Sequence, residues 1–141
     1  MGISENFTLP GAQVLNHGTA GNSTTFVGYL PSQGVRSISI VVPITMGNAG
    51  DETITVKTAD DASGTNPTVL TQNIPIYKDG VRATDAKAFT ETAATGNFVY
   101  VFEVPASIIP EGKYIGVVQS ETGSASSIYS AIAIEDPYYK G

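Results

Sequence analysis

The chain contains no cysteine and no tryptophan, and it has a single histidine. Without cysteine it can form no disulfide framework, no thiolate metal site and no cysteine nucleophile. The histidine, His17, lies in a segment rich in glycine and asparagine. Such a segment lacks the rigid scaffold that a catalytic triad or a histidine metal site requires. The sequence therefore predicts no catalytic residue, no metal ligand and no cofactor of these kinds.

Charge is scarce as well. Charged residues make up 14% of the 141 residues, and the net charge is −6, whereas ordinary soluble domains contain about 25% charged residues. The seven basic residues form no dense patch, so we expect no binding to nucleic acid. A surface of neutral polar residues suits a chain that packs against copies of itself or against a larger partner.

Long apolar runs are also missing. No segment approaches the ~20 consecutive apolar residues that cross a membrane, so no membrane partner is expected. The N-terminus has no basic region followed by an apolar run, and we therefore expect no signal peptide.

The strongest fold signal is a pair of runs rich in β-branched and aromatic residues, 98–104 and 113–119. Between them lies a connector that contains Pro105, Pro110 and Gly112. Proline cannot donate to a strand ladder, and glycine accepts turn conformations without a Cβ clash. This stretch predicts a strand, a corner that crosses over, and a second strand, as in a β-sandwich.

Turn residues recur at intervals of roughly ten residues along the rest of the chain, and no long segment has the helical period. The sequence therefore predicts an all-β, antiparallel β-sandwich, Ig-like or jelly-roll-like, with about seven to eight strands. The expected domains are an extended N-terminal arm (1–23), the β-sandwich domain (24–135) and a C-terminal tail (136–141). The predicted strands are 24–30, 37–42 with an extension past Pro43 to Ile44, 53–58, a broken strand in 69–77, an edge strand or a helical turn in 83–92, 98–104, 113–119 and 128–135, with turns at 48–51 and 78–80.

Two groups of acidic residues are candidates for chemistry. The loop Asp60–Asn66 offers closely spaced oxygen atoms and a glycine, but its acids are adjacent and the twelfth position is Thr71, unlike an EF-hand loop. A turn capped by Asp and Asn side chains explains the same residues, and calcium binding stays open. Glu103 and Glu111 flank the corner, and nothing in the sequence activates either carboxylate. No enzymatic activity is predicted.

The predicted partner contacts lie in the arm and the tail. The arm carries isolated apolar residues without a period of two or of 3.6, and such arms commonly dock on neighbouring subunits. Packing of the arm on its own domain is the alternative. Two tyrosines of the tail, Tyr138 and Tyr139, are expected to anchor on a neighbouring surface. The arm residues expected to contact a partner are Phe7, Leu9, Val14 and Leu15.

Three segments resemble the small structural proteins of tailed-bacteriophage virions. They are 54–61 (Ile-Thr-Val-Lys-Thr-Ala-Asp-Asp), 75–81 (Pro-Ile-Tyr-Lys-Asp-Gly-Val) and 109–114 (Ile-Pro-Glu-Gly-Lys-Tyr). The arm followed by a sandwich with a Ser/Thr-rich surface is similar too.

The resemblance implies a capsid decoration or head auxiliary (cement) protein, which is present in many copies and is often trimeric. Its implied partners are copies of itself and other virion proteins such as the major capsid protein, and its implied place is the virion, assembled in the host cytoplasm. A carbohydrate-binding or adhesive module that recognises a cell surface is the alternative function.

Overall fold

The computed structural model describes residues 12–17, 25–31, 34–122 and 128–137. Over these residues the chain is all-β and antiparallel, as predicted, with one short 3₁₀ turn and no α-helix. Nine strands are present, slightly more than predicted, because two of them are only two residues long. The elements are β1 (Ala12–His17), β2 (Thr25–Pro31), β3 (Val35–Ala59), β4 (Thr68–Val69), β5 (Ile76–Lys78), β6 (Val81–Arg82), β7 (Ala88–Pro105), η1 (Ala106–Ile108), β8 (Tyr114–Thr122) and β9 (Ile128–Pro137).

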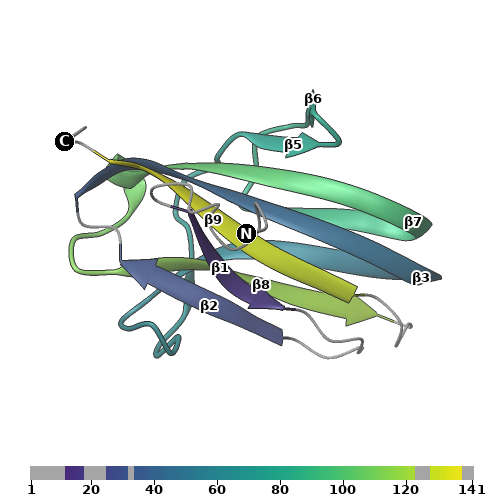
Figure 1. Cartoon of the computed structure of the whole chain (residues 1–141), viewed down its shortest axis with the longest axis horizontal. Helices are drawn as coiled ribbons and strands as arrows, with labels where there is room; N and C mark the ends of the chain where they lie inside the picture. The colour runs from purple at the N-terminus through teal and green to yellow at the C-terminus, as the bar shows by residue number, and fades with distance from the viewer. Residues whose placement is uncertain (1–11, 18–24, 32–33, 123–127, 138–141) are drawn as a thin grey trace, which may run out of the picture.

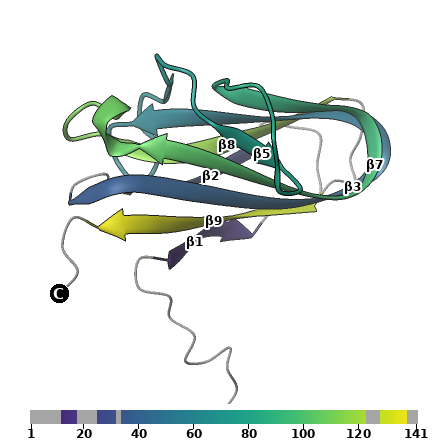
Figure 2. The same ribbon diagram turned by 90° about the horizontal axis from the view of Figure 1, so that it is seen from above.

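The fold is organised by β3 and β7, which are 25 and 18 residues long. They pair along most of their length, from Ser37 opposite Pro105 to Thr55 opposite Ala88. This two-stranded ribbon folds back on itself at one end of the molecule, as Figure 2 shows, so that each strand contributes to both layers of the sandwich. The strand register shifts between Met46 and Gly50, which is where the ribbon bends.

The folded ribbon creates two layers (Figure 1). Layer I has the order β1, β9, the first half of β3, the second half of β7, β5 and β6. Layer II has the order β2, β8, the second half of β3 and the first half of β7. The short strand β4 pairs with the end of β3, on the same side of β3 as β7. Because β3 and β7 run through both layers, all nine strands form one continuous hydrogen-bonded system.

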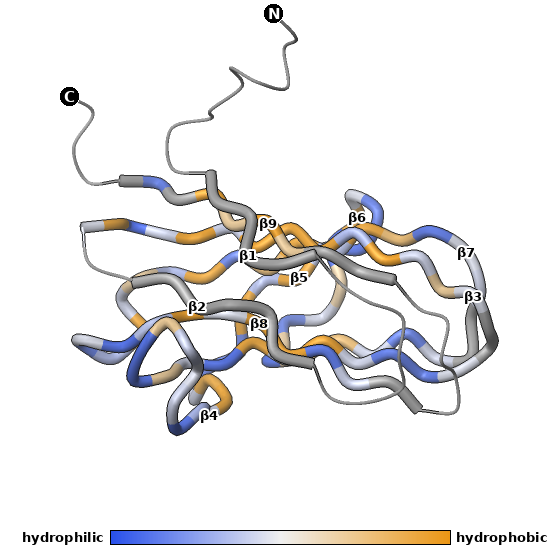
Figure 3. The backbone as a smooth tube through the Cα atoms, turned by 60° about the horizontal axis from the view of Figure 1, so that its bottom comes forward, coloured by the Kyte–Doolittle hydropathy of each residue, from blue (hydrophilic) through white to orange (hydrophobic). Residues whose placement is uncertain are grey.

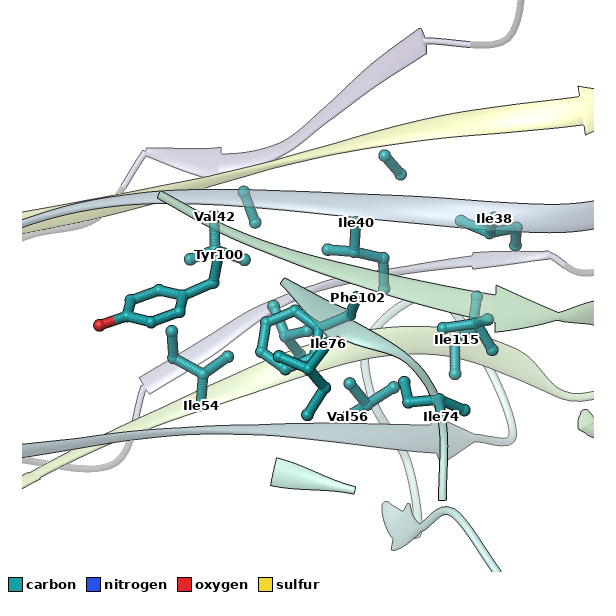
Figure 4. Close-up of a cluster of buried hydrophobic side chains, with 14 of the residues drawn as sticks. Ile38, Ile40, Val42, Ile54, Val56, Ile74, Ile76, Tyr100, Phe102 and Ile115 are labelled. Atoms are coloured by element: carbon teal, nitrogen blue, oxygen red, sulfur yellow. The ribbon is translucent and has the colours of Figure 1, made fainter. Parts of the chain in front are cut away.

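The core fills the space between the two layers. Along β3 the even-numbered residues point inward in both layers, from Ile38 to Met46 and from Glu52 to Val56, and they are at most 2% exposed. In Figure 4 the side chains of Tyr100 and Phe102 lie between Val42 and Ile40 of layer I and Ile54 of layer II. Figure 3 shows hydrophobic stretches along the strands and a hydrophilic loop that leads to β4. The alternation of period two that predicted these strands thus positions the core.

The predicted corner after β7 is confirmed. The strand β7 ends in layer I at Pro105, the turn η1 follows, and β8 begins in layer II at Tyr114. The Lys113 amide donates to the Pro110 carbonyl at 3.1 Å, and Gly112 has a φ of +76°. That backbone conformation favours glycine, so the residue ends the corner as the sequence indicated.

Other local predictions had mixed outcomes. The strand predicted for 37–42 runs through Pro43 and well beyond it. The turn predicted at 48–51 is wrong, because β3 continues through these residues as one strand and folds back together with β7 (Figure 2). Turn-forming residues at these positions bend the ribbon instead of connecting two separate strands. The turn at 78–80 connects β5 and β6, as predicted, with left-handed φ angles at Asp79 and Gly80. The segment 83–92 contains no helical turn, and it becomes a strand from Ala88.

The division into arm, sandwich and tail stays a prediction. Part of the segment predicted as the arm, Ala12–His17, forms β1 and pairs with β9 of the same chain. The residues before Ala12 and after Pro137 lie outside the described residues.

Candidate functional site

The two outer faces of the sandwich differ in chemistry. On layer II the outward residues Thr53 and Thr90 are cross-strand partners, and their hydroxyl oxygens lie 2.8 Å apart. The odd-numbered residues of β3 point outward in both layers, and in layer I these residues include Val41 and Pro43. One long strand therefore presents a threonine-rich face in one layer and an apolar face in the other.

We call the apolar surface of layer I the apolar band. Its residues share one face of three adjacent strands and are all partly or well exposed. Val99 is 41% exposed and Ile134 is 38% exposed. The apolar band consists of Val41, Pro43, Val99, Val101, Ile132 and Ile134.

The strand register places these residues side by side. Val41 is the cross-strand partner of Ile132 on one side and of Val101 on the other. Val101 is in turn the partner of Tyr77, which belongs to β5. A continuous row of apolar and aromatic residues therefore crosses four strands. Cross-strand neighbours of this kind pack against one another on a sheet surface.

The charged side chains that border the apolar band interact within the chain. Ser39 Oγ donates a hydrogen bond to Glu103 Oε2 at 2.7 Å. Arg36 and Asp136 form an ion pair with an N to O distance of 3.9 Å. The ion pair cancels its own two charges, whereas Glu103 keeps its negative charge, because a hydroxyl does not neutralise a carboxylate.

A second ion pair stands at the far end of the row, beyond Tyr77. Arg82 is the register partner of Tyr77, and its guanidinium donates to both carboxylate oxygens of Asp85, at 2.9 and 3.1 Å. The hydrogen bonds and charge of Asp85 raise the pKa of Arg82. The guanidinium is therefore permanently charged and already occupied by a carboxylate.

Of the residues predicted to contact a partner, Val14 lies next to the apolar band. Val14 of β1 is the register partner of Ile132, so β1 borders the apolar band along β9. Leu15 lies in the same strand, at a register irregularity between Val14 and Asn16. The other predicted contact residues lie outside the described residues: Phe7, Leu9, Tyr138 and Tyr139.

Sequence reasoning missed the apolar band. Its members stand in segments that were predicted as strands, but neighbouring apolar residues such as Val41 and Val42, or Phe98 and Val99, left the exposed face undefined. The alternation of apolar and polar residues around Ile38 and Ile40 could have indicated it. If the even-numbered residues of β3 point inward, Val41 and Pro43 must point outward.

A polar cluster, formed by Lys78, Glu91 and Tyr100, lies inside the sandwich near the bend. The Glu91 carboxylate accepts a hydrogen bond from the Tyr100 hydroxyl at 2.6 Å and pairs with Lys78 Nζ at 2.5 Å. Lys78 Nζ also lies 4.7 Å from the centre of the Phe98 ring, a cation–π contact. The sequence analysis did not identify this cluster, although the inward phase of β7 at Tyr100 and Phe102 could have indicated the buried tyrosine.

The cluster stabilises the fold and has no free reactive group. Burial, followed by the hydrogen bond to Glu91 and its negative charge, raises the pKa of Tyr100. The phenol therefore stays protonated at neutral pH and keeps donating to the carboxylate. Glu52, buried to 1% exposure, is the register partner of Glu91 and adds to the same shift.

The loop Asp60–Asn66 is held by its own side chains. The Asp61 carboxylate accepts hydrogen bonds from the Ser63 amide at 2.9 Å and from the Thr65 hydroxyl at 2.6 Å, and the Asp60 carboxylate accepts from Asn66 at 2.8 Å and pairs with Lys113. The bonds from Lys113 and Asn66 lower the pKa of Asp60, and those from Thr65 lower the pKa of Asp61. This is the turn capped by Asp and Asn side chains that the sequence suggested.

The remaining candidate positions do not converge. Glu103 accepts from Ser39 on layer I, whereas Glu111 is exposed in the corner. Within the described residues, no group of three or more His, Cys, Asp and Glu side chains could hold a metal ion. His17 belongs to β1, where its register partner is Ser130 of β9.

One hollow near the corner is small. It has a volume of about 60 Å³ and lies between β4 and the residues after η1, with Leu70, Ile108 and Pro110 in its wall. Pockets for small organic ligands usually measure roughly 300–1,000 Å³. The hollow therefore fits a water molecule or a single side chain.

Among the described residues, no helix is long and apolar enough to cross a membrane.

Comparison with known proteins gives a distant structural likeness. No protein-family model matches the chain, and no curated protein matches it. Among solved structures, the fold is similar to the crystal structure of the SPBc2 prophage-derived protein YomS. The two chains are 12% identical, the alignment covers 89% of this chain and 91% of that chain, and the TM-score is 0.46.

Proposed function

We propose that the chain is a non-enzymatic structural protein of a tailed-phage virion, which binds neighbouring subunits as a multi-copy decoration or auxiliary (cement) protein. The observation that carries this proposal is the apolar band. An open sheet face of Val, Ile and Pro side chains, framed by polar and paired charged residues, has the anatomy of a protein–protein interface, with an apolar centre and a polar rim.

The composition supports the same function. A chain with 14% charged residues gains little of its solubility from charge. Burial of the apolar band on a neighbour removes the part of the surface that is least compatible with water. Additional contacts are proposed in the arm and the tail, and β1, which borders the band, supports this for Val14. The proposed contact residues are Phe7, Leu9, Val14, Leu15, Tyr138 and Tyr139.

The non-enzymatic part of the proposal is supported by the state of the acidic groups. The carboxylates of Glu91 and Glu103 are held by hydrogen bonds or ion pairs within the chain, and so is that of Asp61. A general acid or base needs a proton that it can exchange with a substrate. Carboxylates fixed in this way stabilise the fold instead.

The test is the composition of the virus particle. Particles produced from the genome that encodes this chain are purified on a density gradient, and their proteins are counted by quantitative mass spectrometry. We expect several copies of the chain per particle, and antibodies against the purified chain should label intact particles in electron micrographs. Absence of the chain from purified particles would contradict the proposal. Binding of the free protein to cell-surface glycans would then favour the adhesive alternative.

A further inference from the structure

The apolar band carries an inference about what covers it, which rests on the proposed function because both use this surface. The middle of the second half of β7 reads Phe98, Val99, Tyr100, Val101 and Phe102, with no charged residue, and the Tyr100 hydroxyl is its one polar side-chain group. A continuous apolar run of this kind is typical of a strand that is buried on both faces. In the single chain only the inward face is buried, and Val99 remains 41% exposed. The sequence of β7 therefore suits a strand whose second face is also covered.

The backbone of this region limits how a partner can bind. The second half of β7 pairs with β3 on one side and with β5 on the other, and β3 pairs with β9. A partner strand therefore cannot add to the ladder at the band. The partner must lie on top of the side chains, as one sheet packs on another at about 10 Å.

The charges indicate which partner fits. Although the chain carries a net charge of −6, the charged residues around the band are engaged within the chain, in the pairs Arg36–Asp136 and Arg82–Asp85 and the bond from Ser39 to Glu103. Glu103 keeps its negative charge, because a serine hydroxyl does not neutralise a carboxylate, but it lies at the border of the band, and the six residues of the band are uncharged. A partner with an equally uncharged apolar centre fits this face, and a second copy of this chain presents such a centre.

The area is sufficient for a stable dimer. Layer I extends along β3 from Ser37 to Thr45 and across five strands from β1 to β5. The strands β9, β3 and β7 each run about 30 Å here, whereas β1 and β5 run about 20 Å and about 10 Å, so the face measures roughly 600 Å² per copy. Stable interfaces of standard size bury about 800 Å² per partner, with a spread of about 200 Å². The face therefore lies at the lower end of the standard size.

We propose that two copies of the chain pack face to face through their apolar bands, forming a two-fold symmetric dimer with four layers of β-sheet. The interface is isologous, since the same residues of both copies meet. The dimer is the unit that binds the virion.

The experiment compares two valines with the same exposure. Val99 lies in the apolar band and is 41% exposed, whereas Val69 lies on β4 in layer II and is 40% exposed. The masses of wild type, Val99→Glu and Val69→Glu are measured by light scattering and sedimentation over a range of concentrations. Circular dichroism confirms that each variant retains its β-sheet structure.

We expect wild type and Val69→Glu to have about twice the mass of the 14.7 kDa chain. Val99→Glu should raise the dissociation constant of the dimer at least ~10-fold, because it buries two uncompensated carboxylates at the interface. If Val99→Glu fails to fold, Ile134→Lys on β9 replaces it with the same expectation, since Ile134 is 38% exposed.

Three outcomes overturn the inference: a wild-type monomer at all concentrations, a Val99→Glu dimer as stable as wild type, or equal dissociation of both glutamate variants. These outcomes are separate from the test of the proposed function. A monomer that is present in purified virions overturns the dimer alone, and a dimer that is absent from virions overturns the proposed function alone.

Discussion

Tyr100 and Gln119 are both polar side chains buried in the sandwich, at 1% and 2% exposure, but their surroundings differ. The Tyr100 hydroxyl donates to Glu91, which Lys78 also neutralises. The Nε2 atom of Gln119 has no hydrogen-bond partner among the described residues. A satisfied buried polar group stabilises a fold, whereas an unsatisfied one costs free energy. The two residues should therefore respond to substitution in opposite directions.

Replacement of Tyr100 by phenylalanine should lower the free energy of unfolding by about 2 kcal/mol, the range for a hydrogen bond to a charged group. The change removes the donor to Glu91 and leaves the ring in place. Urea denaturation at neutral pH measures the effect. Tyr77→Phe, on the outer face, is the matched control, and its stability should change by less than about 0.5 kcal/mol. Equal losses in both variants would contradict the role assigned to the buried hydroxyl.

The same tyrosine predicts a pH dependence. Folding holds the pKa of Tyr100 above the value of about 10 for an exposed tyrosine. Its contribution to stability is therefore complete below pH ~10 and is lost as the pH rises from there towards the pKa of the folded state. Denaturation curves between neutral and strongly alkaline pH should show a smaller alkaline loss in Tyr100→Phe than in wild type.

Gln119→Leu should raise the free energy of unfolding by about 1 kcal/mol, because it removes a buried donor without a partner and keeps the volume nearly constant. Thermal denaturation of the variant beside wild type measures the gain. Gln72→Leu applies the same change to an exposed glutamine, and we expect no comparable gain. A destabilised Gln119→Leu would indicate that the amide forms a hydrogen bond in solution.

At the scale of elements, the bend in the β3–β7 ribbon decides the architecture. The bend divides one pair of strands between two layers, and the register shifts on β3 and β7 allow it. Gly96, at the bend in β7, has a φ of +129°, a backbone conformation that side chains with a Cβ rarely adopt. The bend thus depends on backbone freedom at one position of β7.

Gly96→Ala should lower the free energy of unfolding by about 2 kcal/mol, through backbone strain. A clash is not the cause, because the nearest atom to the added Cβ, in the Phe98 ring, would lie 3.8 Å away. Thr92→Ala, at an exposed position of the same strand, serves as the control, with a change below about 0.5 kcal/mol. If both variants unfold at the same urea concentration, the bend tolerates ordinary residues.

The sequence predicted the strands better than their connections. The alternation at 53–58 predicted both the strand and its inward residues Ile54 and Val56, because periodicity is local. At 48–51 the sequence predicts a turn where the structure has a bend within one strand, since the same residue types occur in both. The chain continues through the bend because β7, which is distant in sequence, pairs with both of its sides. The residues around the bend do not indicate which distant strand will pair with them.

At the scale of the whole molecule, the apolar band makes the two outer faces unequal. The threonine-rich face of layer II suits water, whereas the face of layer I suits a partner. The sequence predicted a chain that assembles, from its low charge and its resemblance to virion proteins. It placed the contacts in the arm and tail, because isolated apolar residues in irregular segments are visible in a sequence. A face composed of alternate residues of distant strands becomes visible only in three dimensions.

Assembly through the apolar band should depend weakly on salt. The residues of the band are uncharged, and the charges near it are paired within each chain except for Glu103, so screening changes little when the copies meet. Between 0.05 and 0.5 M sodium chloride, we expect the dissociation constant of the dimer to change less than ~3-fold, and sodium sulfate should strengthen association. Sedimentation measures both effects. A steep weakening with sodium chloride would indicate an interface that depends on charge.

The position of β9 in layer I has a consequence for biosynthesis. This strand follows all the other strands in the sequence, yet it lies between β1 and β3 and supplies Ile132 and Ile134 to the apolar band. A growing polypeptide on the ribosome therefore lacks two residues of the proposed dimer surface until β9 has been made and has paired with β3. The proposed association is thereby tied to the completion of layer I.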